Sequence, residues 1–176
     1  MRRYTKEDIA RFAYENAHMM QYYIVAQTHF RPFNKSDARI AQACDDTAKA
    51  LKHALNCFTS EVNAGHASRA KRKPHIYRPA TFATIECSSA SALRHQTMHV
   101  NLLVGNLPGI LTAQDVQTLF RHCWLNKAQQ ADDVHVCNYD GSRRLIDYTL
   151  KEGSIGDIGI WCVENTFIPR AALHAD

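Results

Sequence analysis

The feature that most constrains the fold is a long amphipathic segment that begins at Ser36 and ends at Gly65. Its apolar side chains recur at steps of three and four residues: Ile40, Cys44, Ala48, Leu51, Leu55, Phe58 and Val62. This spacing predicts one long helix with a single apolar face. Such a face must be buried against another layer of structure, and the short apolar segments elsewhere in the chain indicate a sheet.

Five segments have the β-branched and aromatic content that is typical of strands. They are residues 22–29, 81–87, 97–105, the fourth strand "DVHVCNYDG" and the last strand "IGIWCVEN". Three further helices are predicted over 6–19, from Thr112, and over 142–152 with Gly153 as the C-cap. The order α-β-α-β-β-α-β-α-β predicts an α+β fold, with a central antiparallel sheet of about five strands and helices packed on it.

Length and composition indicate one domain over residues 1–176, of which 45% are hydrophobic and 22% charged. No apolar run approaches the roughly 18 residues that span a bilayer, and the N-terminal "MRRYTKEDIARF" is charged where a signal peptide is apolar. We therefore expect an intracellular protein without a membrane partner. The six cysteines form no C-x-x-C pair, which favours reduced, mostly buried thiols.

Positive charge is concentrated in residues 66–79, which we expect to form a basic loop. Its candidate DNA-binding side chains are Arg69, Lys71, Arg72, Lys73, Tyr77 and Arg78. Such a cluster is typical of a phosphate-contacting surface, although a solvated loop that only aids solubility has the same composition.

Three side chains on the second and third predicted strands form a candidate metal site. Because strand residues alternate between faces, His99 and Asn101 point the same way, and Glu86 lies beside them if the strands pair. One carboxylate, one imidazole and one amide oxygen suit Mg²⁺ or Mn²⁺ better than zinc. Taken singly, a strand histidine or glutamate is more often a packing or surface residue.

Tyr148 and Lys151 are three residues apart on a predicted helix, so their side chains share a face. A phenol, with an ordinary pKa of about 10, is a poor nucleophile at neutral pH. A neighbouring ammonium and a metal-polarised phosphate would correct that weakness. Without a metal site, Tyr148 would be better explained as a packing aromatic. Tyr139 is a weaker candidate for the nucleophile, because it has no lysine at helical spacing.

Glu86, "MHVNLLVG" and "YTLKEG", in this order, resemble the HUH endonuclease superfamily, the replication initiators and relaxases that nick single-stranded DNA. "YTLKEG" is similar to the Tyr-x-x-Lys-Glu-Gly motif of rolling-circle replication proteins of small single-stranded DNA viruses, and "QTHFRP" resembles the first motif of the family. The resemblance spans about residues 22 to 165. It implies an RRM-like or ferredoxin-like sheet with the metal on one face and the tyrosine helix over it.

One position departs from the family pattern. Asn101 stands where the family has a second histidine, or a glutamine in the viral members, and His95 is an alternative ligand.

The resemblance implies a metal-dependent nickase and ligase of the rolling-circle replication initiator type, which acts through a covalent 5′-phosphotyrosine at Tyr148, with Lys151 steadying the phenolate. Arg143 and Arg144 would join the basic loop in binding single-stranded DNA or a hairpin at an origin, and a helicase would come from another chain. The alternatives are a plasmid relaxase or single-strand transposase with the same chemistry, and a non-catalytic module that binds single-stranded nucleic acid. The setting would be the cytoplasm of a bacterial host, or the nucleus if the element is viral.

Overall fold

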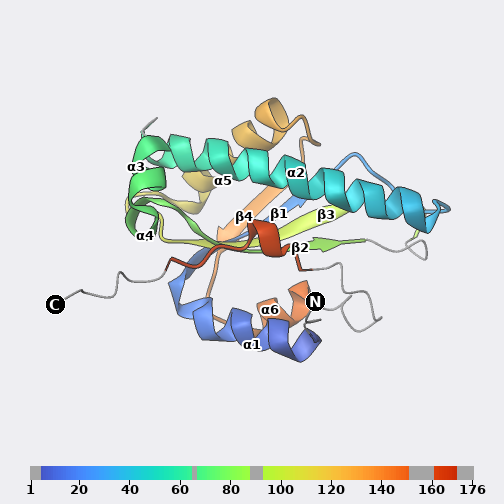
Figure 1. Cartoon of the computed structure of the whole chain (residues 1–176), viewed down its shortest axis with the longest axis horizontal. Helices are drawn as coiled ribbons and strands as arrows, with labels where there is room; N and C mark the ends of the chain where they lie inside the picture. Colours follow the sequence, from blue (N-terminus) through green and yellow to red (C-terminus); the bar gives the residue numbers. More distant parts are fainter. Residues whose placement is uncertain (1–4, 65–66, 88–92, 151–160, 170–176) are drawn as a thin grey trace.

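The computed structural model describes residues 5–64, 67–87, 93–150 and 161–169 (Figure 1). The elements follow the chain as α1 (Lys6–Asn16), the short 3₁₀ helix η1 (Ala17–Met19), β1 (Met20–Gln27), α2 (Asp37–Val62), α3 (Ala67–Arg72), α4 (Pro74–Tyr77), β2 (Ala80–Glu86), β3 (His99–Gly105), α5 (Ala113–Arg121), the π-helical turn η2 (His122–Lys127), β4 (Val134–Asn138), α6 (Arg143–Thr149) and the 3₁₀ helix η4 (Val163–Asn165).

The four strands form one sheet in the order β2-β3-β1-β4, and every neighbouring pair is antiparallel. The predicted α+β fold is therefore confirmed, as is the pairing of β2 with β3. The predicted last strand, 158–165, is wrong in its described part, where Trp161 makes only an isolated bridge to Thr84 before the chain turns into η4. Residues 158–160 lie outside the described part of the chain.

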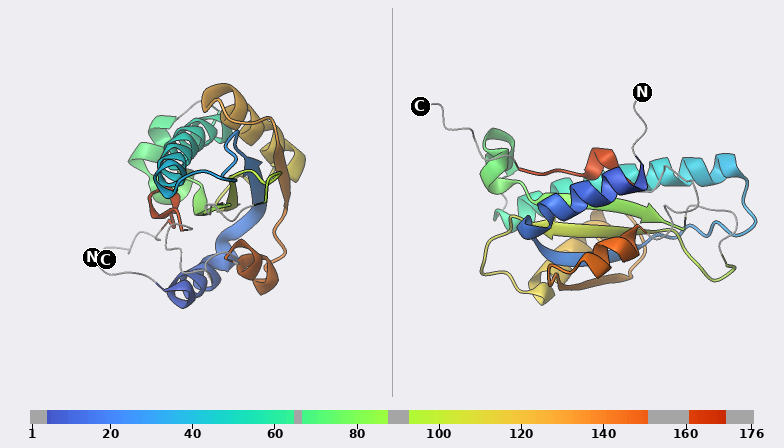
Figure 2. Two further views of the ribbon diagram at one scale, coloured as in Figure 1. Left: turned by 90° about the vertical axis from the view of Figure 1, so that its right-hand side faces the viewer. Right: turned by 90° about the horizontal axis from the view of Figure 1, so that it is seen from below.

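Helices cover both faces of the sheet (Figures 1 and 2). The apolar face of α2, through Leu51 and Phe58, joins α5 and η2 in the larger core above Ile24 and Leu102. On the opposite face α1 and α6 cover a smaller core that includes Phe82, Leu103 and Ile146. The 26-residue α2 thus packs along the sheet as its pattern predicts.

Side-chain caps explain where the helices begin. Thr5 with Asp8 and Thr112 with Asp115 form complete capping boxes, so two backbone N–H groups are satisfied at the start of α1 and of α5. Ser36 caps α2 through the backbone N–H of Arg39. The predicted first helix is confirmed, with 17–19 wound as the 3₁₀ helix η1.

The basic segment is not the loop that the sequence predicts. It is folded into α3 and α4, and Pro74 occupies the first turn of α4, where a missing N–H costs no hydrogen bond. Asn106 Nδ2 holds this segment against the start of the α5 connection by donating to the Arg78 carbonyl at 2.8 Å.

Gly105 ends β3 where two backbones approach closely. A Cβ on this residue would lie 1.8 Å from the Met19 carbonyl oxygen, so only glycine fits beside the irregular pairing of Met20. No helix in the described ranges is both long enough and apolar enough to cross a bilayer.

Candidate active site

The candidate site lies on the sheet face that α1 and α6 cover, at the end where β2 stops and β3 begins. Residues paired across antiparallel strands share a face, and the register pairs Glu86 with His99 and Thr84 with Asn101. The predicted common face of Glu86, His99 and Asn101 is therefore what the pairing produces.

Glu86 and His99 are in direct contact. The carboxylate Oε2 lies 3.2 Å from the imidazole Nε2, and the Glu86 side chain is fully buried while His99 is 16% exposed. On its other side the ring Nδ1 lies 3.1 Å from the Thr97 carbonyl oxygen. Both ring nitrogens thus face acceptors, which fits an imidazolium that donates twice.

The surroundings of His99 favour its charged form. Burial by itself lowers the pKa of the ring, but hydrogen bonds with the Cys87 and Glu86 side chains and with the Thr97 carbonyl outweigh burial and raise the pKa to about 10. In the absence of an ion, His99 therefore carries a proton at neutral pH and neutralises the buried carboxylate.

Asn101 is held at one end only. Its Oδ1 accepts a hydrogen bond of 2.6 Å from the hydroxyl of Tyr23, while its buried Nδ2 has no partner among the described residues. Because amide O and N can be exchanged by rotation, the same geometry allows Nδ2 to donate to Tyr23 and Oδ1 to face the cavity. Burial raises the pKa of Tyr23, which keeps it a neutral hydroxyl beside this amide.

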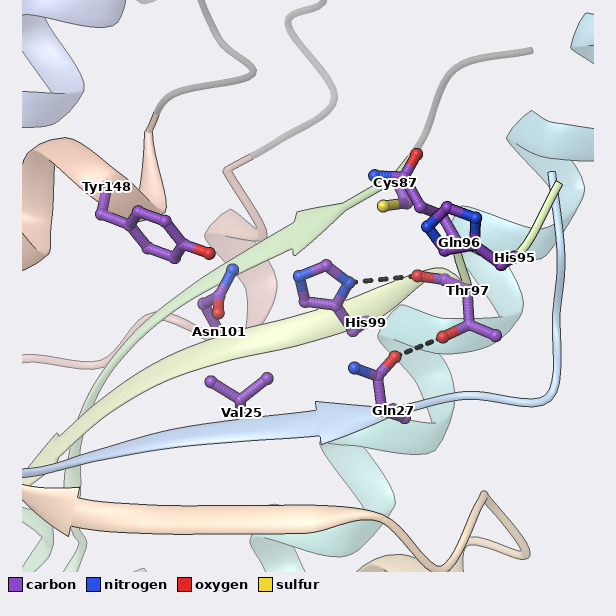
Figure 3. A pocket seen from close by; sticks show the side chains of 9 residues that line it. All are labelled: Val25, Gln27, Cys87, His95, Gln96, Thr97, His99, Asn101 and Tyr148. Carbon is purple, nitrogen blue, oxygen red and sulfur yellow. Dashed lines mark hydrogen bonds between the residues drawn. The ribbon is translucent and has the colours of Figure 1, made fainter. Parts of the chain in front are cut away.

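Tyr148 reaches the same site from α6. Its side chain is 52% exposed, and it lines a cavity of about 340 Å³ together with His99 and Asn101. Figure 3 shows its hydroxyl directed toward Asn101 and His99. The predicted nucleophile and the predicted ligands therefore lie on one side of the sheet.

Two of these residues, Glu86 and His99, are spaced as ligands of one divalent ion would be. Ligands about 2.1 Å from one ion and 90–110° apart are separated by about 3.0–3.4 Å, which matches the Glu86–His99 contact. The Asn101 atom that has no partner among the described residues is Nδ2, an N–H donor, so Asn101 supplies a third ligand only in the rotated amide that turns Oδ1 toward the cavity. Within the described ranges no three His, Cys, Asp or Glu side chains already surround one point, so the set depends on Asn101 or on a further donor.

Of two further predicted site residues, His95 and Lys151, the structure describes only the first. His95 lines the same cavity, on the far side of His99 from Asn101, and stays an alternative ligand (Figure 3). Lys151, predicted to assist Tyr148, lies outside the described residues, as does Gly153.

The candidate DNA-binding residues fall into two groups. Arg143 and Arg144 are exposed on α6, and Arg144 precedes Tyr148 by four residues, so the two side chains are neighbours on the helix surface. The guanidinium of Arg143 lies over the ring of Tyr14 at 5.1 Å.

The second group lies at the other end of the sheet. Arg69, Lys71, Arg72 and Lys73 are exposed on or just after α3, whereas Arg78 packs over Phe167 at 4.3 Å and Tyr77 is half-buried. This group joins the start of β2, and the seven residues of β2 separate it from Glu86 by roughly 20 Å. The structure therefore does not bring the basic segment to the cavity.

Sequence reasoning missed two residues of the site. Tyr23 contacts Asn101 because β1 lies beside β3, and strand order cannot be read from spacing. Cys87 follows Glu86, and simple alternation would turn its side chain to the opposite face. It nevertheless lines the cavity, because its φ of 57° breaks the alternation.

Comparisons with known proteins found no matching family model, curated protein or solved structure.

Proposed function

We propose that this protein is a metal-dependent, single-tyrosine nickase of the HUH endonuclease type that cuts and rejoins single-stranded DNA. One observation carries the proposal: the half-exposed Tyr148 directs its hydroxyl into the cavity that His99 and Asn101 line, and His99 in turn contacts the buried carboxylate of Glu86. A packing aromatic has no need of this position, because Ile146 of α6 and Leu150 just after the helix already pack into the core of this face.

Glu86, His99 and Asn101 would hold a Mg²⁺ or Mn²⁺ ion, with His95 as an alternative ligand. When bound, the ion would polarise the scissile phosphate and lower the charge that an attacking oxygen meets. The Glu86 side chain is fully buried, so solvent does not compete for its carboxylate oxygens.

Tyr148 would attack the phosphorus. Its oxygen forms the new P–O bond as the bond to the 3′ oxygen breaks, the phenol loses its proton, and the leaving 3′ oxygen gains one. The product is a 5′-phosphotyrosine and a free 3′-hydroxyl. The reverse attack by a 3′-hydroxyl restores Tyr148, so joining needs no nucleotide.

Arg144 is placed to assist at the phosphate. It is exposed and lies one helical turn before Tyr148, so its guanidinium can pair with a phosphate oxygen next to the attacking hydroxyl. Lys151 would steady the phenolate, as the sequence suggests. Rolling-circle initiation is the role we infer, and a plasmid relaxase or single-strand transposase would use the same site. A duplex-unwinding helicase would be a separate protein.

The test is formation of a covalent adduct. Incubation with labelled single-stranded DNA and Mn²⁺ should give a protein–DNA species that survives denaturation, and Tyr148→Phe should abolish it. Tyr139→Phe is the matched control, because Tyr139 is buried and its hydroxyl donates to the Ser142 carbonyl at 3.2 Å. An adduct that persists in Tyr148→Phe would reject Tyr148 as the nucleophile.

A nucleic-acid-binding module without chemistry is the rival from another class. It is favoured by the exposed basic side chains on α3, which lie away from the cavity. In that case DNA affinity would be unchanged by EDTA, and no adduct would form with any metal.

A further inference from the structure

The helix that carries Tyr148 is short and depends on its neighbours for its position. α6 has seven residues, and Ser142 at its start makes no side-chain capping bond. Isolated helices of fewer than about 12 residues are marginal in water, so tertiary contacts decide how such a helix is placed. On this side of the sheet the neighbour is α1, and the two helices lie side by side (Figures 1 and 2).

Three consecutive side chains of α6 have three different surroundings. Ile146 is fully buried in the smaller core, and Tyr148 lines the cavity. Between them, the Asp147 carboxylate accepts a hydrogen bond from the hydroxyl of Tyr14 on α1. Successive residues are about 100° apart around a helix axis, so a contact that fixes Asp147 against α1 also fixes the direction in which Tyr148 points.

The hydrogen bond restricts the rotation of α6 in a way that apolar packing does not. Burial of Ile146 and Leu150 holds the helix against the sheet, but the hydrophobic effect has no preferred direction. A hydrogen bond weakens steeply as its angle departs from linear. The bond between Tyr14 and Asp147 is therefore the contact that is most sensitive to a turn of the helix.

Arg143 adds a second contact to the same tyrosine. Its guanidinium lies over the Tyr14 ring at 5.1 Å, and it precedes Asp147 by four residues, so both side chains are on the face of α6 that meets α1. The hydrogen bond with Asp147 and, next, burial raise the pKa of the Tyr14 phenol, which keeps it a neutral donor. One side chain of α1 thus contacts two successive turns of α6.

The contact lies near the surface, so it can be removed without opening the core. Tyr14 is half-buried and Asp147 is exposed, whereas α1 is anchored by the buried Ile9 and Ala13. Substitutions at such positions change global stability little. An effect on the direction of Tyr148 can therefore be separated from an effect on folding.

We propose that Tyr14 is a positioning residue, which acts through Asp147 to hold α6 at the angle that directs the Tyr148 hydroxyl into the cavity. This inference rests on the proposed function for the role of Tyr148. It extends that function to α1, which supplies none of the described residues that line the cavity.

Three variants isolate the hydrogen bond. Tyr14→Phe removes the hydroxyl and keeps the ring beneath Arg143. Asp147→Ala removes the acceptor, while Asp147→Asn keeps an amide oxygen that can still accept. Tyr22→Phe is the matched control, because the Tyr22 hydroxyl donates to the Leu111 carbonyl on the opposite face of the sheet.

Amide hydrogen exchange tests the contact without any DNA. The amides of residues 147–150 should exchange at least about fivefold faster in Tyr14→Phe and in Asp147→Ala, and at nearly the wild-type rate in Asp147→Asn and Tyr22→Phe. Because alanine favours helices, faster exchange in Asp147→Ala would not come from a loss of helix propensity. Unchanged exchange in Tyr14→Phe would overturn the proposal.

The rate of the DNA adduct tests the positioning. With labelled single-stranded DNA and Mn²⁺, the rate at saturating DNA should fall at least about tenfold in Tyr14→Phe and in Asp147→Ala, because small displacements of reacting groups are costly. The DNA concentration that gives half of this rate should change by less than about twofold, since no DNA contact is removed. The two substitutions combined should be no slower than either alone, because they remove one bond.

Rescue by the conservative variant completes the test. Asp147→Asn should react within about threefold of the wild type, and an Asp147→Asn rate as low as that of Asp147→Ala would overturn a role through the hydrogen bond. An equal loss in Tyr22→Phe would also overturn it, since that loss would reflect general destabilisation.

The two proposals fail in different ways. Faster exchange in α6 with a wild-type adduct rate would leave the nickase standing and remove the positioning role of Tyr14. A wild-type protein that forms no adduct with any metal would remove the nickase, and the exchange measurements would still decide whether Tyr14 holds α6.

Discussion

The carboxylate of Glu86 and the imidazole of His99 face each other across β2 and β3, with Oε2 3.2 Å from Nε2. They occupy paired positions of the antiparallel ladder, so the register itself sets their contact. Because the carboxylate is fully buried, the His99 proton has a structural role whenever no ion is bound.

Stability without metal should therefore depend on pH. The pKa of His99 is about 10 in the folded protein, against an ordinary value of about 6.5 in the unfolded chain. The folded state holds the proton more tightly, so this contribution is complete below about pH 6.5 and is lost as the pH rises toward 10. Urea unfolding in EDTA should show a decline in the free energy of unfolding over this window, and His99→Gln should show a smaller decline. Equal slopes in the two proteins would contradict the assigned pKa.

Tyr23 should matter for metal binding, although it is not itself a ligand. Tyr23→Phe leaves the inner end of the buried Asn101 amide without its hydrogen-bond partner, which should cost about 1–3 kcal/mol of stability and lower Mn²⁺ affinity by releasing the amide. Tyr22→Phe is the neighbouring control, since the Tyr22 hydroxyl donates to the Leu111 carbonyl on the opposite face. Calorimetric titration with Mn²⁺ should show a change in Tyr23→Phe alone. A similar loss of affinity in both variants would indicate a general effect of destabilisation.

The basic residues of α3 should affect the affinity for long single-stranded DNA rather than the formation of the covalent adduct. We expect the double substitution of Lys71 and Lys73 by glutamine to weaken binding of long single strands and to reduce the slope of log K against log salt by about 0.7 per lost contact. Adduct formation with a short oligonucleotide at saturation should be unchanged, because α3 is separated from Glu86 by the length of β2.

The matched control for this prediction replaces Lys49 and Lys52 by glutamine on the exposed side of α2. That variant carries the same loss of charge away from α3, so an equal effect would indicate general electrostatics. A slower reaction of the short oligonucleotide in the α3 variant would place α3 nearer the chemistry than this structure does.

Gly105 should be intolerant of any side chain. Gly105→Ala places a Cβ against the Met19 carbonyl oxygen, which forces β1 and β3 apart and should cost at least about 2 kcal/mol. Gly109→Ala, with no atom within 4 Å of its added Cβ, should be close to neutral. Thermal unfolding compares the two, and a wild-type melting temperature for Gly105→Ala would show that the close approach is relaxed in solution.

The sequence by itself determined the local elements and the faces of the strands. The three- and four-residue spacing from Ile40 to Val62 predicted α2, and the Thr5–Asp8 and Thr112–Asp115 signals marked two helix starts. These features depend on contacts within a few residues, so local chemistry fixes them. Alternation likewise placed His99 and Asn101 on one face.

Sequence patterns did not predict the secondary structure correctly in two segments, where residues nearby in the chain do not decide the conformation. The basic residues of 66–79 were predicted as a loop, yet most of them form α3 and α4. The described part of the predicted fifth strand makes only one isolated bridge, from Trp161 to Thr84.

Tertiary structure alone decided the composition of the candidate site. Only the order β2-β3-β1-β4 brings Tyr23 to Asn101, only the packing of α6 over the sheet brings Tyr148 to the cavity, and only the left-handed backbone turns Cys87 toward His99. The Tyr23 and Tyr148 contacts join residues that are far apart in sequence, and their spacing says nothing about their distance in the fold. The Cys87 side chain departs from the alternation of faces that holds for regular strands. The physical reason is that strand order and backbone strain are set by the packing of the whole chain, whereas spacing records only the period of one element.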